Sequence, residues 1–249
     1  MNAHNSNSTI DPKTVLVMGG SGVIGGAICM RFAEMNWKVG IHYHQHDDSA
    51  KKIYAHFYDQ EETHSLYHAD VQDPQQVANA INRFMEHWGK IDVLIWSVGE
   101  TKNLATIRTS PEQWNTLIQI NLTGLFFCLR QVGSIFHNQG YGSVLVVSSL
   151  ASTQGDIGQT AYAATKAGIL GLIRSAAHEW GKSNICVNAV FPGWHPSILS
   201  GDAFPSPETL NDHLLGRTPN LRETADHIFH LATSKDISGQ CFNLDSRIW

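Results

Sequence analysis

The stretch MGGSGVIGGA, residues 18–27, contains five glycines and follows the apolar run Val15 to Val17. A helix-like pattern of apolar residues begins where the glycines end. Glycine lets the backbone pass close to another group because it has no side chain. A turn this rich in glycine, between a strand and a helix, therefore indicates a close approach of backbone to something.

Within this stretch, residues 20–25 have the spacing G-x-G-x-x-G. Between a strand and a helix, the bare N–H groups and the positive end of the helix dipole can bind the diphosphate of a dinucleotide. The alternative is a tight turn that only lets the helix pack closely on the strand. The strand and the helix on either side favour dinucleotide binding.

Composition predicts one domain that acts on small molecules. The chain has 249 residues, 42% of them hydrophobic, and a formal net charge of −5. We expect residues 13–249 to form a single domain after a flexible lead-in of residues 1–12. The lead-in lacks the pattern of a signal peptide, and no apolar run approaches the ~20 residues of a membrane helix. The acidic balance excludes a general attraction to nucleic acid or membranes.

Strand-like and helix-like segments alternate along the chain. β-rich runs lie at residues 14–18, 38–43, 64–68, 91–96, 143–148, 185–191 and 240–244, and helical patterns fill most gaps. Asp73-Pro74 and Ser110-Pro111 mark two helix starts. The order predicts an α/β fold: a Rossmann-like, doubly wound parallel sheet of about seven strands with helices on both faces.

A second group of residues indicates proton chemistry. Tyr162 and Lys166 are four residues apart on a predicted helix, so both side chains leave the same face. A neighbouring ammonium favours the phenolate and lowers the tyrosine pKa, which lets the pair exchange protons. Ser149 stands thirteen residues before Tyr162, at the end of the fifth strand, where its hydroxyl can hold a substrate oxygen. The alternative is an ordinary surface pair, and the combination with the glycine turn argues against it.

In their order and spacing these residues resemble the short-chain dehydrogenase/reductase family over almost the whole chain. The family's active site has a serine followed by Y-x-x-x-K, and here these positions are Ser149, Tyr162 and Lys166. Asn121 in the run IQINLTGLFF corresponds to the family's active-site asparagine. The resemblance implies an enzyme that interconverts a carbonyl and an alcohol of a small molecule by hydride transfer with a nicotinamide cofactor.

The resemblance also implies a role for each catalytic residue. In the reduction direction Ser149 would hydrogen-bond the carbonyl and Tyr162 would donate the proton. Lys166 would lower the pKa of the tyrosine and hold the nicotinamide ribose, and Asn121 would position a water that links Lys166 to solvent. Donors and positive charge then stand where the alkoxide develops.

Cofactor contacts are implied in the glycine turn, at the ends of the second, third and fourth strands, beside the catalytic residues and in the Pro-Gly segment after the sixth strand. They are Gly19, Ser21, Gly22, Val23, Ile24, Tyr43, His44, Asp70, Val71, Ser97, Val98, Gly99, Tyr162, Lys166, Pro192, Gly193 and Ser197.

The end of the second strand predicts which cofactor is used. A carboxylate there would bind the ribose 2′-OH of NAD, but Tyr43 occupies that position. We therefore expect NADP, with His44 or His46 near its 2′-phosphate, and NAD as the alternative. The basic residue that many NADP users carry in the glycine turn is replaced by Gly22.

The chain departs from the family pattern at three places. In the register of T-G-x-x-x-G-x-G, Met18 replaces the threonine and Val23 replaces the middle glycine. The glycine spacing at positions 19, 22 and 25 resembles longer members of the superfamily, which include epimerases and dehydratases. The usual Asn-Ala-Gly is residues 97–99, Ser-Val-Gly, and the terminal Asp-Gly-Gly is residues 245–247, Asp-Ser-Arg.

No metal site is expected. His42, His44 and His46 alternate and would share one face of a strand, but no cysteine or carboxylate completes a ligand set. The four cysteines have no C-x-x-C spacing, which indicates neither a zinc site nor a disulfide framework and fits a cytoplasmic protein. They are Cys29, Cys128, Cys186 and Cys241.

The substrate is not identified by the sequence. Residues 194–221 have the turn-rich character of a lid, and Trp194 either lines the substrate pocket or packs. A 3-oxoacyl-carrier-protein reductase-like activity is an alternative, although Arg130 is the only Lys or Arg between Thr109 and Thr165. A non-catalytic dinucleotide-binding regulatory protein and epimerase or dehydratase chemistry are further alternatives.

Two helical segments predict self-association. Residues 121–139 and 160–181 are apolar beyond one stripe and carry too few charges to cover a solvated face. The resemblance points to the same two helices as a subunit interface. We expect a homodimer or homotetramer, and the alternative is a monomer whose flanking segments bury the surplus.

Overall fold

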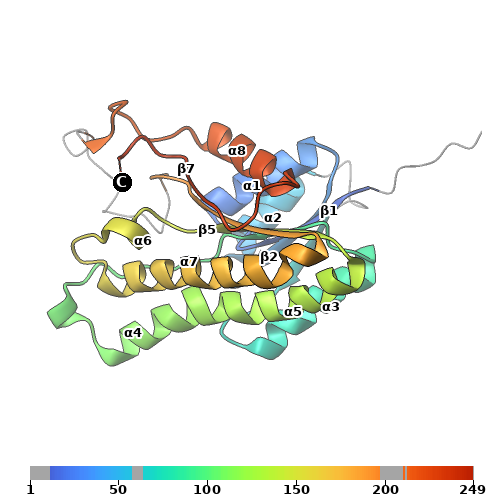
Figure 1. Ribbon diagram of the computed structural model, residues 1–249, viewed down its shortest axis with the longest axis horizontal. Coiled ribbons are helices and arrows are strands. Elements are labelled where there is room, and N and C mark those ends of the chain that lie inside the picture. Colours follow the sequence, from blue (N-terminus) through green and yellow to red (C-terminus); the bar gives the residue numbers. More distant parts are fainter. Residues whose placement is uncertain (1–11, 58–63, 197–209, 211, 249) are drawn as a thin grey trace, which may run out of the picture.

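One parallel β-sheet organises the molecule (Figure 1). The computed structural model describes residues 12–57, 64–196, 210 and 212–248. In this part of the chain seven strands pair in the order β3-β2-β1-β4-β5-β6-β7, all parallel. They are β1 (Thr14–Met18), β2 (Lys38–Tyr43), β3 (His64–His68), β4 (Val93–Trp96), β5 (Gly142–Val147), β6 (Ile185–Phe191) and β7 (Cys241–Asn243). The predicted doubly wound sheet is confirmed.

Helices cover both faces of the sheet. Figure 1 shows α3, α5 and α7 on one face and α1 and α8 on the other. The helices are α1 (Val23–Glu34), α2 (Asp47–Ala55), α3 (Pro74–Trp88), α4 (Pro111–Ile118), α5 (Gly124–Gln139), α6 (Ala151–Gln154), α7 (Thr160–Trp180) and α8 (Leu221–Thr233). None of the described helices is long and apolar enough to cross a membrane.

The central strands are apolar throughout because helices bury both of their faces. Successive side chains of a strand point to opposite sides. In β1, Leu16 and Met18 belong to the core beneath α3, α5 and α7, whereas Val15 and Val17 belong to the core beneath α1 and α8. The sheet is thus the middle layer of three.

Local signals set where two helices begin. The Asp73 carboxylate caps α3 by accepting hydrogen bonds from the N–H groups of Gln75 and Gln76, at 2.8 and 3.2 Å. At α4, Ser110 and Gln113 form a reciprocal capping box. Both helix starts expected from the sequence are confirmed.

The turn after β1 requires glycine at two positions. Gly19 has a φ of +81°, and a Cβ on it would lie 2.7 Å from the backbone carbonyl carbon of Ser97. A Cβ on Gly25 would overlap the carbonyl oxygen of Gly19. Backbone meets backbone at this point, so α1 begins directly beside the carboxyl end of β1.

The strand order places the site. The chain moves from β1 to β2 and β3 on one side and to β4, β5, β6 and β7 on the other. Connections therefore diverge at β1 and β4, and in such sheets ligands bind at the carboxyl ends of the strands beside this switch point. The glycine turn lies at that edge.

Candidate active site

The four candidate catalytic side chains come from three parts of the fold. Ser149 follows β5, and Tyr162 and Lys166 lie one turn apart on α7. Asn121 lies in a π-helical segment, Gln119–Thr123, that joins α4 to α5. Such segments are frequent at functional sites.

Lys166 is buried at the centre of this group, with only 3% of its surface exposed. Its Nζ donates a hydrogen bond to the carbonyl of Val147 at 3.0 Å and lies 5.6 Å from the centroid of the Tyr162 ring. Burial lowers the pKa of Lys166 to about 8, because removing the ammonium from water favours the neutral amine.

Tyr162 differs from expectation in the direction of its pKa. Burial raises the pKa of Tyr162, and a hydrogen bond with Ser149 lowers it by less. The predicted lowering by Lys166 is therefore wrong for this geometry. The reason is that the Lys166 Nζ binds the Val147 carbonyl while the phenol is removed from water.

Asn121 joins the loop after β4 to α7. Its Oδ1 accepts from the N–H of Glu100 at 2.8 Å, and its Nδ2 donates to the carbonyl of Glu100 at 2.9 Å. The same Nδ2 donates to the Thr165 hydroxyl at 3.1 Å. These bonds fix the loop at Glu100 and its neighbour Gly99. Gly99 lies close to the catalytic group, since a Cβ on it would be 3.4 Å from the Lys166 Nζ and 3.8 Å from the Asn121 Oδ1.

The glycine turn fits a diphosphate. Gly22 is the N-cap of α1, and no side chain caps this helix and no acidic residue occupies its first turn. Among the described residues, a Cβ on Gly22 would meet only the carbonyl oxygen of Gly19, at an ordinary 3.5 Å. Neither packing nor backbone conformation requires glycine here. The open space lies over the N-terminus of α1, where Val23 and Ile24 begin the helix and backbone N–H groups favour an anion.

The predicted adenosine contacts lie at the ends of β2 and β3. The Tyr43 ring packs against His68 with centroids 5.4 Å apart, and the Nε2 of His44 lies 3.9 Å from the Asp70 carboxylate. Val71 differs from the other candidates, because its side chain is buried in the core against α5.

The predicted nicotinamide contacts border the same edge. Gly19 packs on the backbone of Ser97 and Val98, so the loop after β4 adjoins the glycine turn. Pro192 and Gly193 directly follow β6.

The segment after Gly193 is tied to the C-terminal residues. The Trp194 ring lies 5.9 Å from the guanidinium of Arg247. Arg247 in turn binds the fully buried Asp245 carboxylate through Nε and Nη2, each at 2.5 Å. Arg247, one of the two residues that break the family's terminal pattern, thus contacts the start of the predicted lid.

Ser197 lies outside the described residues, as do residues 1–11 of the predicted lead-in and residues 198–209 and 211 of the predicted lid.

The three alternating histidines do not share a strand face. β2 ends at Tyr43, so only His42 lies in the strand, and it is buried between backbone groups. His46 is the residue before α2, and His44 lies beside Asp70. Among the described residues no group of three or more His, Cys, Asp or Glu side chains could hold a metal ion.

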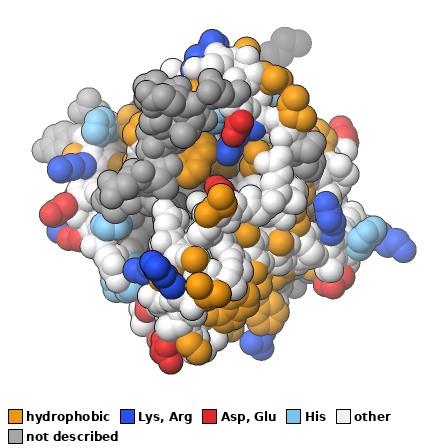
Figure 2. Space-filling view, turned by 90° about the vertical axis from the view of Figure 1, so that its left-hand side faces the viewer, with side chains coloured by type: hydrophobic (Ala, Val, Ile, Leu, Met, Phe, Trp, Pro, Cys, Tyr) orange, Lys and Arg blue, Asp and Glu red, His pale blue; other side chains and the backbone are white. Residues whose placement is uncertain are grey.

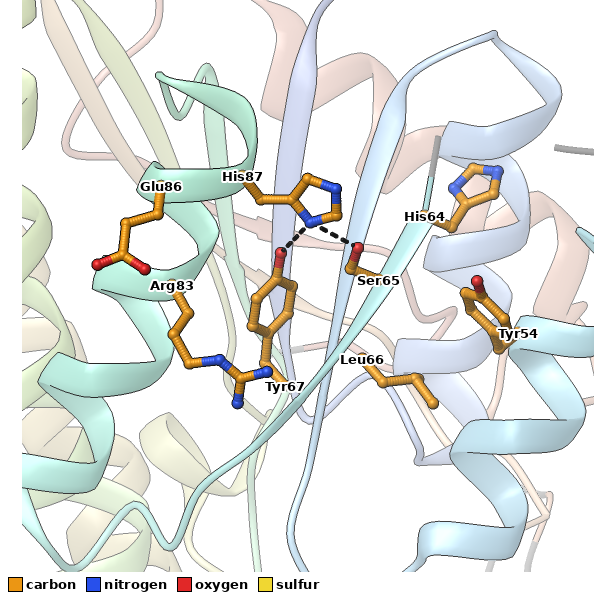
Figure 3. Close-up of a pocket in the computed structure, with 8 residues that line it drawn as sticks. All are labelled: Tyr54, His64, Ser65, Leu66, Tyr67, Arg83, Glu86 and His87. Atoms are coloured by element: carbon orange, nitrogen blue, oxygen red, sulfur yellow. Dashed lines mark hydrogen bonds between the residues drawn. The ribbon is translucent and has the colours of Figure 1, made fainter. Parts of the chain in front are cut away.

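A cavity of about 670 Å³ lies away from these residues, at the free edge of β3. Figure 3 shows its walls: Tyr54 from α2, residues 64–67 of β3, and Arg83, Glu86 and His87 from α3. Side chains on both faces of β3 line it, and the His87 Nδ1 bridges Ser65 and Tyr67 at 2.9 and 3.5 Å. It is the groove that remains where the sheet ends, and no candidate catalytic residue lines it.

Sequence reasoning missed the backbone partners of the site. The Val147 carbonyl and the Glu100 amide group bind Lys166 and Asn121, yet nothing in the residue types at these positions signals a contact. For His42 the signal is its place directly after the buried residues Val39, Gly40 and Ile41 of β2, where a buried imidazole needs hydrogen-bond partners.

Comparison with known proteins identifies the family. The model of the short chain dehydrogenase family matches residues 13–203. An acetoacetyl-CoA reductase of Rhizobium meliloti is 35% identical over 207 residues, which cover 83% of this chain and 83% of the relative. The 3-oxoacyl-[acyl-carrier-protein] reductase FabG of Staphylococcus epidermidis is 30% identical over 244 residues, 95% of this chain and 99% of the relative.

Solved structures agree with these relatives. The structure of ElxO with NADP bound superposes with a TM-score of 0.86 at 26% identity, covering 94% of this chain and 98% of ElxO. The crystal structure of gox2181 has a TM-score of 0.88 at 27% identity, covering 95% of both chains. The sequence match, the shared fold and the arrangement of Ser149, Tyr162 and Lys166 lead to one conclusion: this chain belongs to the short chain dehydrogenase family.

Proposed function

We propose that the protein is an NADPH-dependent reductase that converts the ketone of a small molecule to a secondary alcohol. The observation that carries the proposal is the meeting of Tyr162, Lys166 and Ser149 beside an uncapped helix N-terminus and an open glycine turn. The names of the reductase relatives and the NADP bound to ElxO support it.

The bound cofactor would supply the hydride. Ser149 and Tyr162, which share a hydrogen bond, would hold the substrate carbonyl oxygen, and Tyr162 would donate its proton to the developing alkoxide. The phenolate left behind lies near the Lys166 ammonium, whose charge then stabilises it. Stabilising the phenolate in this way would oppose, without outweighing, the rise in the Tyr162 pKa that burial causes.

Two features restore the proton and hold the ribose in this proposal. A pKa near 8 lets Lys166 both carry and release a proton close to neutral pH. Asn121 positions the water that links Lys166 to solvent, and its side chain also fixes the loop at Glu100. Lys166 would also hold the nicotinamide ribose, and this contact would compete with its hydrogen bond to the Val147 carbonyl.

NADP is favoured over NAD by the groups at the end of β2. Tyr43 supplies no carboxylate there, and His44 offers an imidazole to the 2′-phosphate. The Nε2 of His44 lies 3.9 Å from the Asp70 carboxylate, at the side of the site proposed for the adenosine.

A second candidate substrate class is a 3-oxoacyl thioester. The curated relatives favour it, since they are named for acetoacetyl-CoA and for 3-oxoacyl groups on a carrier protein. A carrier protein is less favoured than a small thioester because Arg130 is the only Lys or Arg from residue 109 to residue 165. To distinguish a thioester substrate from a simple ketone, the rate of NADPH oxidation is measured with acetoacetyl-CoA and with simple ketones.

We also propose that residues 13–249 act as one cytoplasmic catalytic domain with residues 194–221 as its lid. The domain assembles as a homodimer or homotetramer through α5 and α7. Figure 2 shows hydrophobic side chains gathered on the lower part of the face that carries α4 and α6. Phe126 on α5 is 48% exposed, whereas Leu125 is fully buried, so Phe126 is the residue that tests the interface.

Replacing Tyr162 by Phe removes the hydroxyl that carries the transferable proton and keeps the ring. We expect NADPH affinity to stay within about threefold of the parent and kcat for ketone reduction to fall by roughly 10²–10⁴. NADPH fluorescence titration and steady-state kinetics measure the two effects. Tyr54→Phe, at the edge groove beside β3, is the matched control. Parental turnover in the Tyr162 variant would show that the proposed proton donor is wrong.

Tyr43→Asp should shift preference from NADPH towards NADH. A carboxylate placed near the 2′-phosphate repels it, and we expect NADPH to bind on the order of tenfold more weakly. Tyr43→Asn removes the same ring without adding charge and is the control for lost packing against His68. If the parent protein binds NADH more tightly than NADPH, the NADP assignment fails.

The lowered pKa of Lys166 predicts a rise in stability with pH. Between pH 8 and 10.5 the unfolded chain binds more protons at this residue than the folded chain, so the free energy of unfolding increases. From pH 8 to 9.5 this contribution is roughly 1–2 kcal/mol. The raised pKa values of Cys29 and Cys128 act in the opposite direction, since the unfolded thiols ionise first.

Urea unfolding of the parent and of Lys166→Met isolates this contribution, because both proteins share the cysteines. The stability of the parent relative to the variant should increase from pH 8 to 9.5. A difference that stays constant over this range would contradict the lowered pKa.

Phe126→Arg should break the proposed assembly. Burying a charged side chain at the centre of an apolar interface costs more free energy than the Phe126 contact contributes to binding. Size exclusion with light scattering reports the mass, which is 27.5 kDa for one chain. Met35→Arg, at an exposed position after α1, is the control. A parent protein that is already 27.5 kDa at micromolar concentration contradicts the assembly, and an unchanged larger mass in the variant contradicts this interface.

A further inference from the structure

His42 is a buried imidazole that the proposed chemistry does not use. It lies in β2, between β1 and β3, with 2% of its surface exposed. Its Nδ1 accepts a hydrogen bond from the N–H of Gly19 at 3.0 Å. Its Nε2 donates to the carbonyl of Ala69 at 3.0 Å. One ring therefore links the ends of two strands that are not neighbours in the sheet.

These two partners define the protonation of the ring. The Gly19 N–H needs an acceptor, so the Nδ1 of His42 carries no proton. The Ala69 carbonyl needs a donor, so the single proton is on Nε2. Burial lowers the pKa of His42 to about 4, which keeps the ring in this neutral form near neutral pH.

Gly19 is the first residue of the glycine turn, and its conformation directs the residues that follow. Its carbonyl accepts from the N–H of Gly22 at 3.1 Å, and its own N–H is held by His42. These bonds hold both sides of Gly19 at its φ of +81°, and the turn leads directly into α1. The N–H groups of Val23 and Ile24, which begin α1, have no partner within the helix.

Ala69 is the residue before Asp70, at the opposite side of the predicted cofactor site. The His42 ring thus spans from the turn proposed to bind the diphosphate to the segment proposed to adjoin the adenine. An imidazole is rigid and planar, so it fixes the separation of these two segments in a way that a flexible side chain does not.

We propose that His42 is a positioning residue of the cofactor site, and that its Nδ1 sets the orientation of the Gly19 amide on which diphosphate binding depends. The inference rests on the proposed binding of NADPH. His42 does not touch the substrate or the reacting atoms; it acts through Gly19 and Ala69.

A role in packing alone is the competing explanation, and the chain contains a matched comparison. His64 is also a buried imidazole, 1% exposed, but neither of its ring nitrogens has a hydrogen-bond partner among the described residues. It lies at the amino end of β3, opposite Val39 of β2, whereas His42 lies opposite Tyr67. His64→Asn therefore replaces a buried imidazole of the same sheet without touching the glycine turn.

Three substitutions separate the two hydrogen bonds of His42. His42→Asn places an amide oxygen at the position of Nδ1 and keeps the acceptor for Gly19. His42→Gln places an amide at the position of Nε2 and keeps the partner of Ala69, but it has no acceptor at the position of Nδ1. His42→Phe keeps a planar ring and removes both bonds.

The measurements are the NADPH dissociation constant by nicotinamide fluorescence, the melting temperature, and the KM values for NADPH and for a ketone. We expect His42→Asn and His64→Asn to bind NADPH within about threefold of the parent. His42→Gln and His42→Phe should bind it on the order of tenfold more weakly, equivalent to about 1.4 kcal/mol, with the KM for the ketone unchanged.

The outcome that overturns the inference is parental NADPH affinity in His42→Gln, or a loss in His42→Asn as large as that in His42→Gln. Should His42→Phe fail to fold, the comparison of the Asn and Gln variants still decides. A parent protein that does not bind NADPH overturns the proposed function itself, and so the two failures are distinct.

Discussion

The contact between the backbone of Gly25 and the carbonyl of Gly19 is the constraint on which the site depends. Because no Cβ intervenes, α1 starts at the very end of β1 and points its first N–H groups across the carboxyl edge of the sheet. The loop after β4 then packs on Gly19 from the other side. The glycine turn thus positions both α1 and the loop after β4, which are the two walls of the proposed cofactor site.

This geometry gives a physical meaning to the unusual glycine spacing. Positions 19 and 25 require glycine for internal reasons, since a side chain at either would strike backbone. Gly22 has no such internal reason and leaves space over the helix N-terminus. Close packing therefore explains Gly19 and Gly25, whereas dinucleotide binding is our proposal for Gly22.

Buried polar side chains at this edge follow a common rule. The ladder of a parallel sheet ends there, so backbone N–H and C=O groups need other partners. Lys166 donates a hydrogen bond to the Val147 carbonyl. Asn121 bonds both the N–H and the carbonyl of Glu100, and His42 bonds the Gly19 N–H and the Ala69 carbonyl. Each bond offsets part of the cost of burying the side chain and at the same time fixes a loop.

The sequence by itself determined the doubly wound sheet, the capped starts of α3 and α4, the family and the residues proposed for catalysis. It could do so because these features depend on periodicity, on turn and cap chemistry and on spacing along one helix, all of which are local. The roles of the individual site residues remain predictions. Only the tertiary structure decided that Val71 belongs to the core, that burial raises the pKa of Tyr162, and that His42 bridges two strands. These features depend on the backbone groups that surround a side chain and on how far water is excluded from it. Segments far apart in the sequence supply that environment.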